Sequence, residues 1–68
     1  MPELATRLRE MRTAAGLTQA ELAGRIGVSR KTINTVENGV FVPSTILALK
    51  LARALKTTVE ELFYLDGA

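Results

Sequence analysis

One short segment carries side chains that can form directional contacts with nucleic-acid bases. Arg30 and Lys31 can donate to the two acceptors on a guanine edge, and Asn34 can pair with both groups on an adenine edge. Thr32 and Thr35 each offer a hydroxyl, and a methyl group that can touch the methyl of thymine. Such a run could read the major groove of DNA, provided that one helix presents the five side chains together.

The helix that would hold these side chains is predicted from its end signals. Ser29 is a favourable N-cap residue directly before Arg30, and Gly39 is the usual left-handed residue that ends a helix. A helix is therefore predicted from Arg30 to about Asn38. Ile33 would face inward and leave the polar residues on the outer or flanking faces.

Another helix is predicted directly before this one. Thr18 to Glu21 has the sequence of a capping box, in which each residue's side chain accepts a hydrogen bond from the other's backbone amide. The helix should run from Gln19 to about Arg25, and Gly27 then supplies the permissive backbone of a turn. Two short capped helices joined in this way are typical of a helix-turn-helix, whose second helix enters the DNA major groove.

Three further helices are predicted around this pair. The first should begin at Pro2 and end at Gly16. Its core-facing residues recur at helical spacing and are Leu4, Leu8, Met11 and Ala15. A fourth helix is predicted over residues 45–56, and a short fifth one follows Thr58. The prediction is an all-α fold of five helices that forms one domain over residues 1–68.

These motifs carry a resemblance to a known family. They are, in chain order, Leu17-Thr18-Gln19-Ala20-Glu21-Leu22-Ala23, Gly27-Val28-Ser29, Ile33, Val36-Glu37-Asn38-Gly39, Pro43-Ser44 and Glu60-Glu61-Leu62-Phe63. The chain resembles the Cro/phage-repressor helix-turn-helix transcription regulators, also called the xenobiotic response element family. The resemblance extends over nearly the whole chain, and it implies a lambda-repressor-like DNA-binding domain.

The resemblance also implies roles for individual residues. The positions that match the family's base contacts are Arg30, Lys31 and Thr35, with Thr32 and Asn34 nearer the rim. The residues expected at backbone phosphates are Thr18, Gln19, Ser29, Asn38 and Arg12. Family members commonly pair an Arg at the position of Arg12 with the Glu before Asn-Gly, so an ion pair between Arg12 and Glu37 is expected. Structural alternatives remain open, such as capping for Ser29 and helix termination for Asn38.

Charge is distributed unevenly along the chain. The net charge is only +2, yet residues 22–56 hold six basic residues against Glu37 alone. The last stretch holds Glu60, Glu61 and Asp66 and no basic residue. A basic middle suits a protein that places one face on phosphate groups, although ordinary solvated surface charge is the alternative.

The composition excludes several other functions. The chain has no Cys and no His, which removes disulfides, thiolate nucleophiles and the usual zinc ligands. We therefore expect neither an enzyme nor a cofactor, metal or small-molecule ligand. No stretch approaches the roughly 18 apolar residues of a membrane span, and the first residues lack a signal-peptide pattern. No membrane contact is predicted, and a cytoplasmic location is expected.

Apolar residues remain after the predicted core is filled. This surplus suggests a symmetric dimer through the C-terminal part of the chain, as in relatives of the family, and the expected contacts are Ile46, Leu49, Leu62, Tyr64 and Leu65. The helix predicted to start at Arg30 would be the recognition helix, the one that enters the major groove. A two-fold dimer would place its two recognition helices one DNA turn apart, about 34 Å, and would bind a near-palindromic sequence. The function that follows is a sequence-specific regulator of double-stranded DNA, expected to be a repressor. The alternative is that the expected dimer contacts are only single apolar residues scattered over the surface.

The loop after the recognition helix departs from the family pattern. Val40 and Val42 stand where many members have polar or basic residues, and they are expected to form an exposed apolar patch, whereas Phe41 is expected to pack on the core. This loop favours a second hypothesis, a protein-binding module such as an antitoxin that holds a partner on its apolar C-terminal surface.

Overall fold

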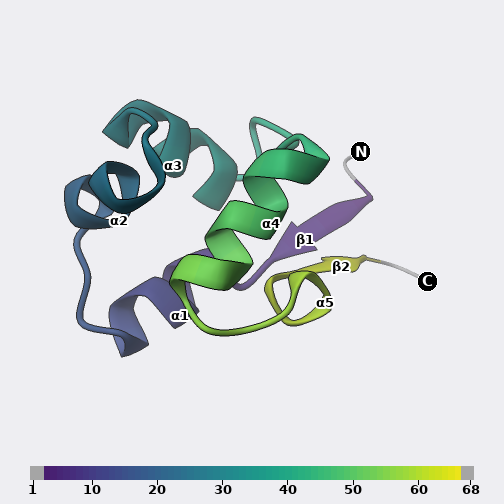
Figure 1. Ribbon diagram of the computed structural model, residues 1–68. Helices are drawn as coiled ribbons and strands as arrows, with labels where there is room; N and C mark the ends of the chain where they lie inside the picture. The colour runs from purple at the N-terminus through teal and green to yellow at the C-terminus, as the bar shows by residue number, and fades with distance from the viewer. Residues whose placement is uncertain (1–2, 67–68) are drawn as a thin grey trace.

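The computed structural model describes residues 3–66, which form five helices and two short strands (Figure 1). The helices are α1 (Leu8–Ala14), α2 (Gln19–Ile26), α3 (Arg30–Glu37), α4 (Thr45–Ala54) and α5 (Val59–Leu62). The strands β1 (Leu4–Thr6) and β2 (Phe63–Leu65) pair antiparallel, with Ala5 opposite Tyr64. The predicted five-helix fold is confirmed, and the small sheet is an addition to it. Within residues 3–66, none of the helices has the length and apolar character needed to cross a membrane.

The segment from α2 to α3 forms the predicted helix-turn-helix. Both bonds of the capping box are present: the Glu21 amide donates to Thr18 Oγ1 at 3.0 Å, and the Thr18 amide donates to Glu21 Oε1 at 2.8 Å. Gly27 ends α2 with a φ of 77°, in the left-handed region that favours glycine. Ser29 caps α3 by accepting from the Thr32 amide at 3.2 Å. Local signals therefore define both helices.

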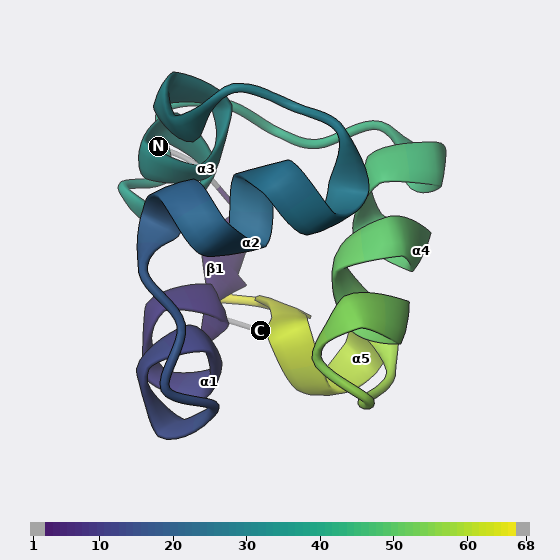
Figure 2. The same ribbon diagram turned by 60° about the vertical axis from the view of Figure 1, so that its left-hand side comes forward.

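The core positions α3 with its polar face outward. Helix α2 packs against both α3 and α4, and α4 packs against α5 (Figure 2). Helix α1 contacts α3. The largest side chains that are fully buried come from all five helices: Leu8, Leu22, Ile33, Val36, Leu51 and Leu62. Because Ile33 and Val36 anchor the apolar face of α3, the opposite, polar face of this helix is turned toward solvent.

The N-terminal segment differs from the prediction. A helix was expected from Pro2, which lies outside the described residues, but Leu4–Thr6 form β1 and α1 begins only at Leu8. The Thr6 hydroxyl accepts from the Leu8 amide at 3.0 Å and donates to the Leu62 carbonyl at 3.0 Å. These bonds, with the pairing to β2, satisfy backbone groups that a longer helix would have satisfied itself. Ala15, expected in the core, is exposed.

The C-terminal segment contains a strand that the sequence did not predict. Helix α5 ends at Leu62, because Phe63 adopts extended backbone angles and starts β2. The Leu62 side chain is fully buried in the core, so the prediction that it contacts a second copy is wrong. Phe41 is exposed instead of packing on the core, because two backbone bonds tie its loop to α3: the Phe41 and Val40 amides both donate to the Thr35 carbonyl.

Candidate nucleic-acid interface

The outward face of α3 forms one polar stripe. Lys31, Asn34, Thr35 and Asn38 recur at helical spacing and therefore lie on the same side of the helix. Arg30, at the start of α3, and Lys31 are both exposed. The helix thus presents together most of the side chains whose types suggested contact with bases.

Gln19 connects the start of α2 to both ends of α3. Its Nε2 donates to Asn34 Oδ1 at 3.2 Å and to Glu37 Oε1 at 3.0 Å. Its Oε1 accepts from Arg30 Nη1 at 3.4 Å. Gln19 lies in the first turn of α2, where unpaired amides favour an anion, and its side chain also contacts that of Arg30.

The other side chains predicted to contact bases already form hydrogen bonds within the protein. Asn34 is half-buried, and its Oδ1 accepts from both Gln19 and Asn38, so this oxygen already has partners before any base approaches. The Thr35 hydroxyl donates to the Thr32 carbonyl at 3.0 Å, and the Thr32 hydroxyl lies 3.0 Å from that of Ser29. The long side chains of Arg30 and Lys31 consequently offer more donors to a base than these residues do.

Glu37 is the centre of the hydrogen-bond network behind the stripe. Its side chain is 0% exposed, and it accepts from Arg12, Gln19 and Arg9. Burial raises the pKa of the Glu37 carboxyl, but the hydrogen bonds from Arg12, Gln19 and Arg9 and the charge of Arg12 outweigh it, so the pKa lies below its ordinary value. The carboxylate remains charged at neutral pH.

Arg12 is held inside this network. Its Nε donates to Glu37 Oε2 at 2.5 Å, and its Nη1 donates to the Leu17 carbonyl at 2.8 Å. The structure thus brings together the two residues expected to form an ion pair, and the hydrogen bond to Glu37 raises the pKa of Arg12. The Arg12 side chain is only 12% exposed, which leaves little of it for the phosphate contact expected from the sequence.

Sequence reasoning missed the second arginine in the network. Arg9 donates from Nε to Glu37 Oε1 at 3.3 Å and from Nη2 to Asn38 Oδ1 at 2.8 Å. Its signal in the sequence is its position three residues before Arg12, which places both arginines on one face of α1.

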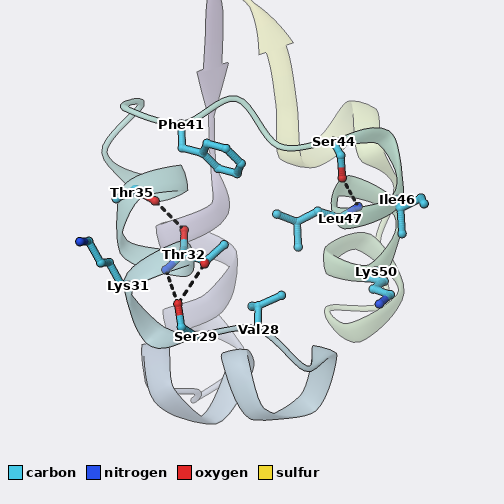
Figure 3. A pocket seen from close by; sticks show the side chains of 10 residues that line it. All are labelled: Val28, Ser29, Lys31, Thr32, Thr35, Phe41, Ser44, Ile46, Leu47 and Lys50. Atoms are coloured by element: carbon cyan, nitrogen blue, oxygen red, sulfur yellow. Dashed lines mark hydrogen bonds between the residues drawn. The ribbon is translucent and has the colours of Figure 1, made fainter.

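A groove runs between the outward face of α3 and the start of α4 (Figure 3). Thr35 lines the α3 side, Lys50 and Ile46 line the α4 side, and Phe41 contributes from the connecting loop. Lys31 borders the groove, but its side chain points away from it, to the outer side of α3 (Figure 3). The residues that line the groove include two lysines and no carboxylate, and this charge balance suits a polyanion that lies beside α3.

Comparison with known proteins agrees with this arrangement. A helix-turn-helix family model matches residues 8–62, which span all five helices. An HTH-type transcriptional regulator from Methanothermobacter thermautotrophicus is 52% identical over 62 residues, which are 90% of each protein. The regulator YgzD from Bacillus subtilis is 37% identical over 60 residues, which are 88% of this chain and 91% of YgzD.

A solved structure gives the same result. The restriction-modification controller protein C.AhdI from Aeromonas hydrophila superposes with a TM-score of 0.77 and 45% identity, over 81% of this chain and 83% of its own. The fold and its polar face define a DNA-binding protein of the helix-turn-helix class. Within that class, the chain belongs to the Cro/C1-type family of helix-turn-helix transcriptional regulators.

Proposed function

We propose that this regulator is a repressor that binds a near-palindromic operator as a homodimer, with α3 of each copy in the major groove. The main support for the proposal is the polar stripe of α3. Arg30 and Lys31 are exposed there, beside the groove between α3 and α4, which no carboxylate lines. A dimer seated on an operator would exclude other proteins from that DNA. We also propose a cytoplasmic location, because its relatives come from organisms such as Methanothermobacter and Bacillus, whose DNA lies in the cytoplasm.

The proposed division of contacts keeps the roles that the family resemblance implies. Arg30 and Lys31 donate to guanine, and Thr35 touches a thymine methyl, while Thr32 and Asn34 lie at the edge of the base contacts. The proposed phosphate contacts are Thr18, Gln19, Ser29 and Asn38. Gln19 is the best supported of these, since it lies in the first turn of α2 and already contacts Arg30.

The proposed dimer contact lies on α4 and the C-terminal strand. Ile46 and Leu49 are 68% and 57% exposed, and Tyr64 and Leu65 of β2 are also exposed. Large apolar side chains of this kind are favourable when a second copy covers them. The same exposure also supports the second hypothesis, in which a different protein, such as a toxin held by an antitoxin, covers this surface.

Selection of preferred duplexes from a random pool at physiological salt, followed by sequencing, tests the proposal. We expect enrichment of a two-fold site whose half-sites are centred about ten base pairs apart, or a multiple of that spacing. Recovery of no motif would contradict operator binding and favour the second hypothesis, for which a stable partner protein should then co-purify.

The variant Arg30→Ala tests the assignment of base contacts on the selected duplex. We expect a loss of about 1–3 kcal/mol in binding free energy and a flattened preference at one base pair. Arg25→Ala, which removes an exposed arginine from the last turn of α2, is the matched control and should leave the base preference intact. An equal loss from Arg30→Ala on random DNA would mean that Arg30 contacts only phosphate.

A further inference from the structure

Arg9 is a partly exposed cation that the base and phosphate contacts proposed above do not include. Its side chain is 59% exposed, although Nε donates to Glu37 and Nη2 donates to Asn38. Two of its nitrogens are therefore held by the protein. A guanidinium has five N–H groups, so Arg9 retains donors for a further acceptor while its plane is already oriented.

The charges around Glu37 do not balance. One buried carboxylate contacts two guanidinium groups, those of Arg12 and Arg9, so the three side chains together carry a charge of +1. Arg12 is enclosed and donates to Glu37 and the Leu17 carbonyl. The excess positive charge is consequently accessible at Arg9, where an anion would complete the balance.

The position of Arg9 indicates which anion would reach it. Its partner Asn38 lies seven residues after Lys31, on the same outward stripe of α3. Arg9 therefore extends this stripe from α1, beyond the end of the recognition helix. Duplex DNA that continues along this line carries about one phosphate charge for every ~1.7 Å of its axis, so the anion expected beside Arg9 is a backbone phosphate.

We propose that Arg9 binds a backbone phosphate of the DNA, with Asn38 and Glu37 holding its guanidinium in place. This assignment rests on the DNA-binding function proposed above. It also gives Arg12 and Arg9 separate tasks: the enclosed Arg12 neutralises Glu37, and the exposed Arg9 contacts DNA. An arginine is suited to this contact with DNA because it can donate to two protein acceptors and to a phosphate at once.

The test measures DNA affinity against salt concentration for the wild-type protein, Arg9→Gln and Arg9→Lys. The probe is a fluorescently labelled duplex of mixed sequence, because a phosphate contact does not depend on the bases. Arg53→Gln is the matched control, since it removes one exposed arginine from α4. Circular dichroism establishes that each variant is folded.

We expect Arg9→Gln to weaken binding severalfold and to lower the slope of log affinity against log salt by about 0.9, the contribution of one phosphate contact. Arg9→Lys should keep the wild-type slope, and Arg53→Gln should leave the slope unchanged. A slope that is unchanged in Arg9→Gln would overturn the assignment, even if affinity falls, because Arg9 would then act only through Glu37. An equal change of slope in Arg53→Gln would also overturn it. Failure of the wild-type protein to bind any duplex would instead overturn the proposed function itself.

Discussion

The Glu37 side chain links three helices by hydrogen bonds behind the proposed DNA-binding face. It belongs to α3, and it accepts hydrogen bonds from Arg9 and Arg12 of α1 and from Gln19 of α2. A buried carboxylate is costly unless charged and polar donors surround it, as they do here. Loss of this carboxylate would leave Arg12 enclosed without its partner.

We expect Glu37→Gln to lower the free energy of unfolding by about 3 kcal/mol at neutral pH, since it breaks a buried ion pair from one side. The pKa of Glu37 is below its ordinary value of 4.5, so the contribution of this residue is complete above that pH and is lost as the pH falls through the lowered value. The difference in stability between the wild-type protein and the variant should shrink in acid. Urea unfolding across that pH range measures it.

Glu10→Gln is the control, because Glu10 is an exposed residue of α1. A constant difference between the wild-type protein and Glu37→Gln at every pH would contradict the lowered pKa of Glu37.

At the level of single residues, the sequence predicts only part of the hydrogen-bond network around Glu37. The pairing of Arg12 with Glu37 is expected from the family resemblance, and the structure brings the two together. The contrast between the enclosed Arg12 and the exposed Arg9 was not predictable, because it depends on how α1 packs against α3. Helical spacing shows only that the two arginines share a face.

At the level of elements, the accuracy of prediction follows the distance between interacting residues. The bounds of α2 and α3 were predicted because their caps are local: Thr18 with Glu21, and Ser29 with Thr32. Strand β1 was not predicted, because its partner lies near the other end of the chain, and the Thr6 hydroxyl bonds a carbonyl 56 positions away. A pattern compatible with a helix therefore became a strand through a long-range contact.

Two glycines near the end of α2 should respond oppositely to substitution. Gly24 lies within the helix, and nothing lies within 4 Å of where a Cβ would stand, so Gly24→Ala should stabilise the protein by about 0.5–1 kcal/mol. Gly27 also has space, but its φ of +77° disfavours any side chain, so Gly27→Ala should destabilise by about 1–2 kcal/mol. Thermal unfolding of both variants measures these effects. Destabilisation by Gly24→Ala would contradict the open environment described for that position.

At the level of the whole molecule, the exposed apolar side chains of α4 predict self-association. Leu49→Glu should preserve the fold, because this side chain is 57% exposed, but it should shift the protein from dimer to monomer through the burial of charge at the interface. Sedimentation without DNA measures the change. Ala15→Glu, at an exposed site after α1, adds the same charge and should leave the mass unchanged. A monomeric wild-type protein would contradict the proposed dimer.

The sheet that joins β1 to β2 has a consequence for the order of folding. The contacts between α2 and α3 join neighbouring segments, so forming them closes only a short loop of chain. The pairing of Leu4 with Leu65 encloses almost the whole described chain, and its entropy cost is correspondingly larger. The helix-turn-helix should therefore form early on the folding pathway. The sheet that fastens α1 to α5 should form late and open first, making it the slow, non-local step of a largely helical protein.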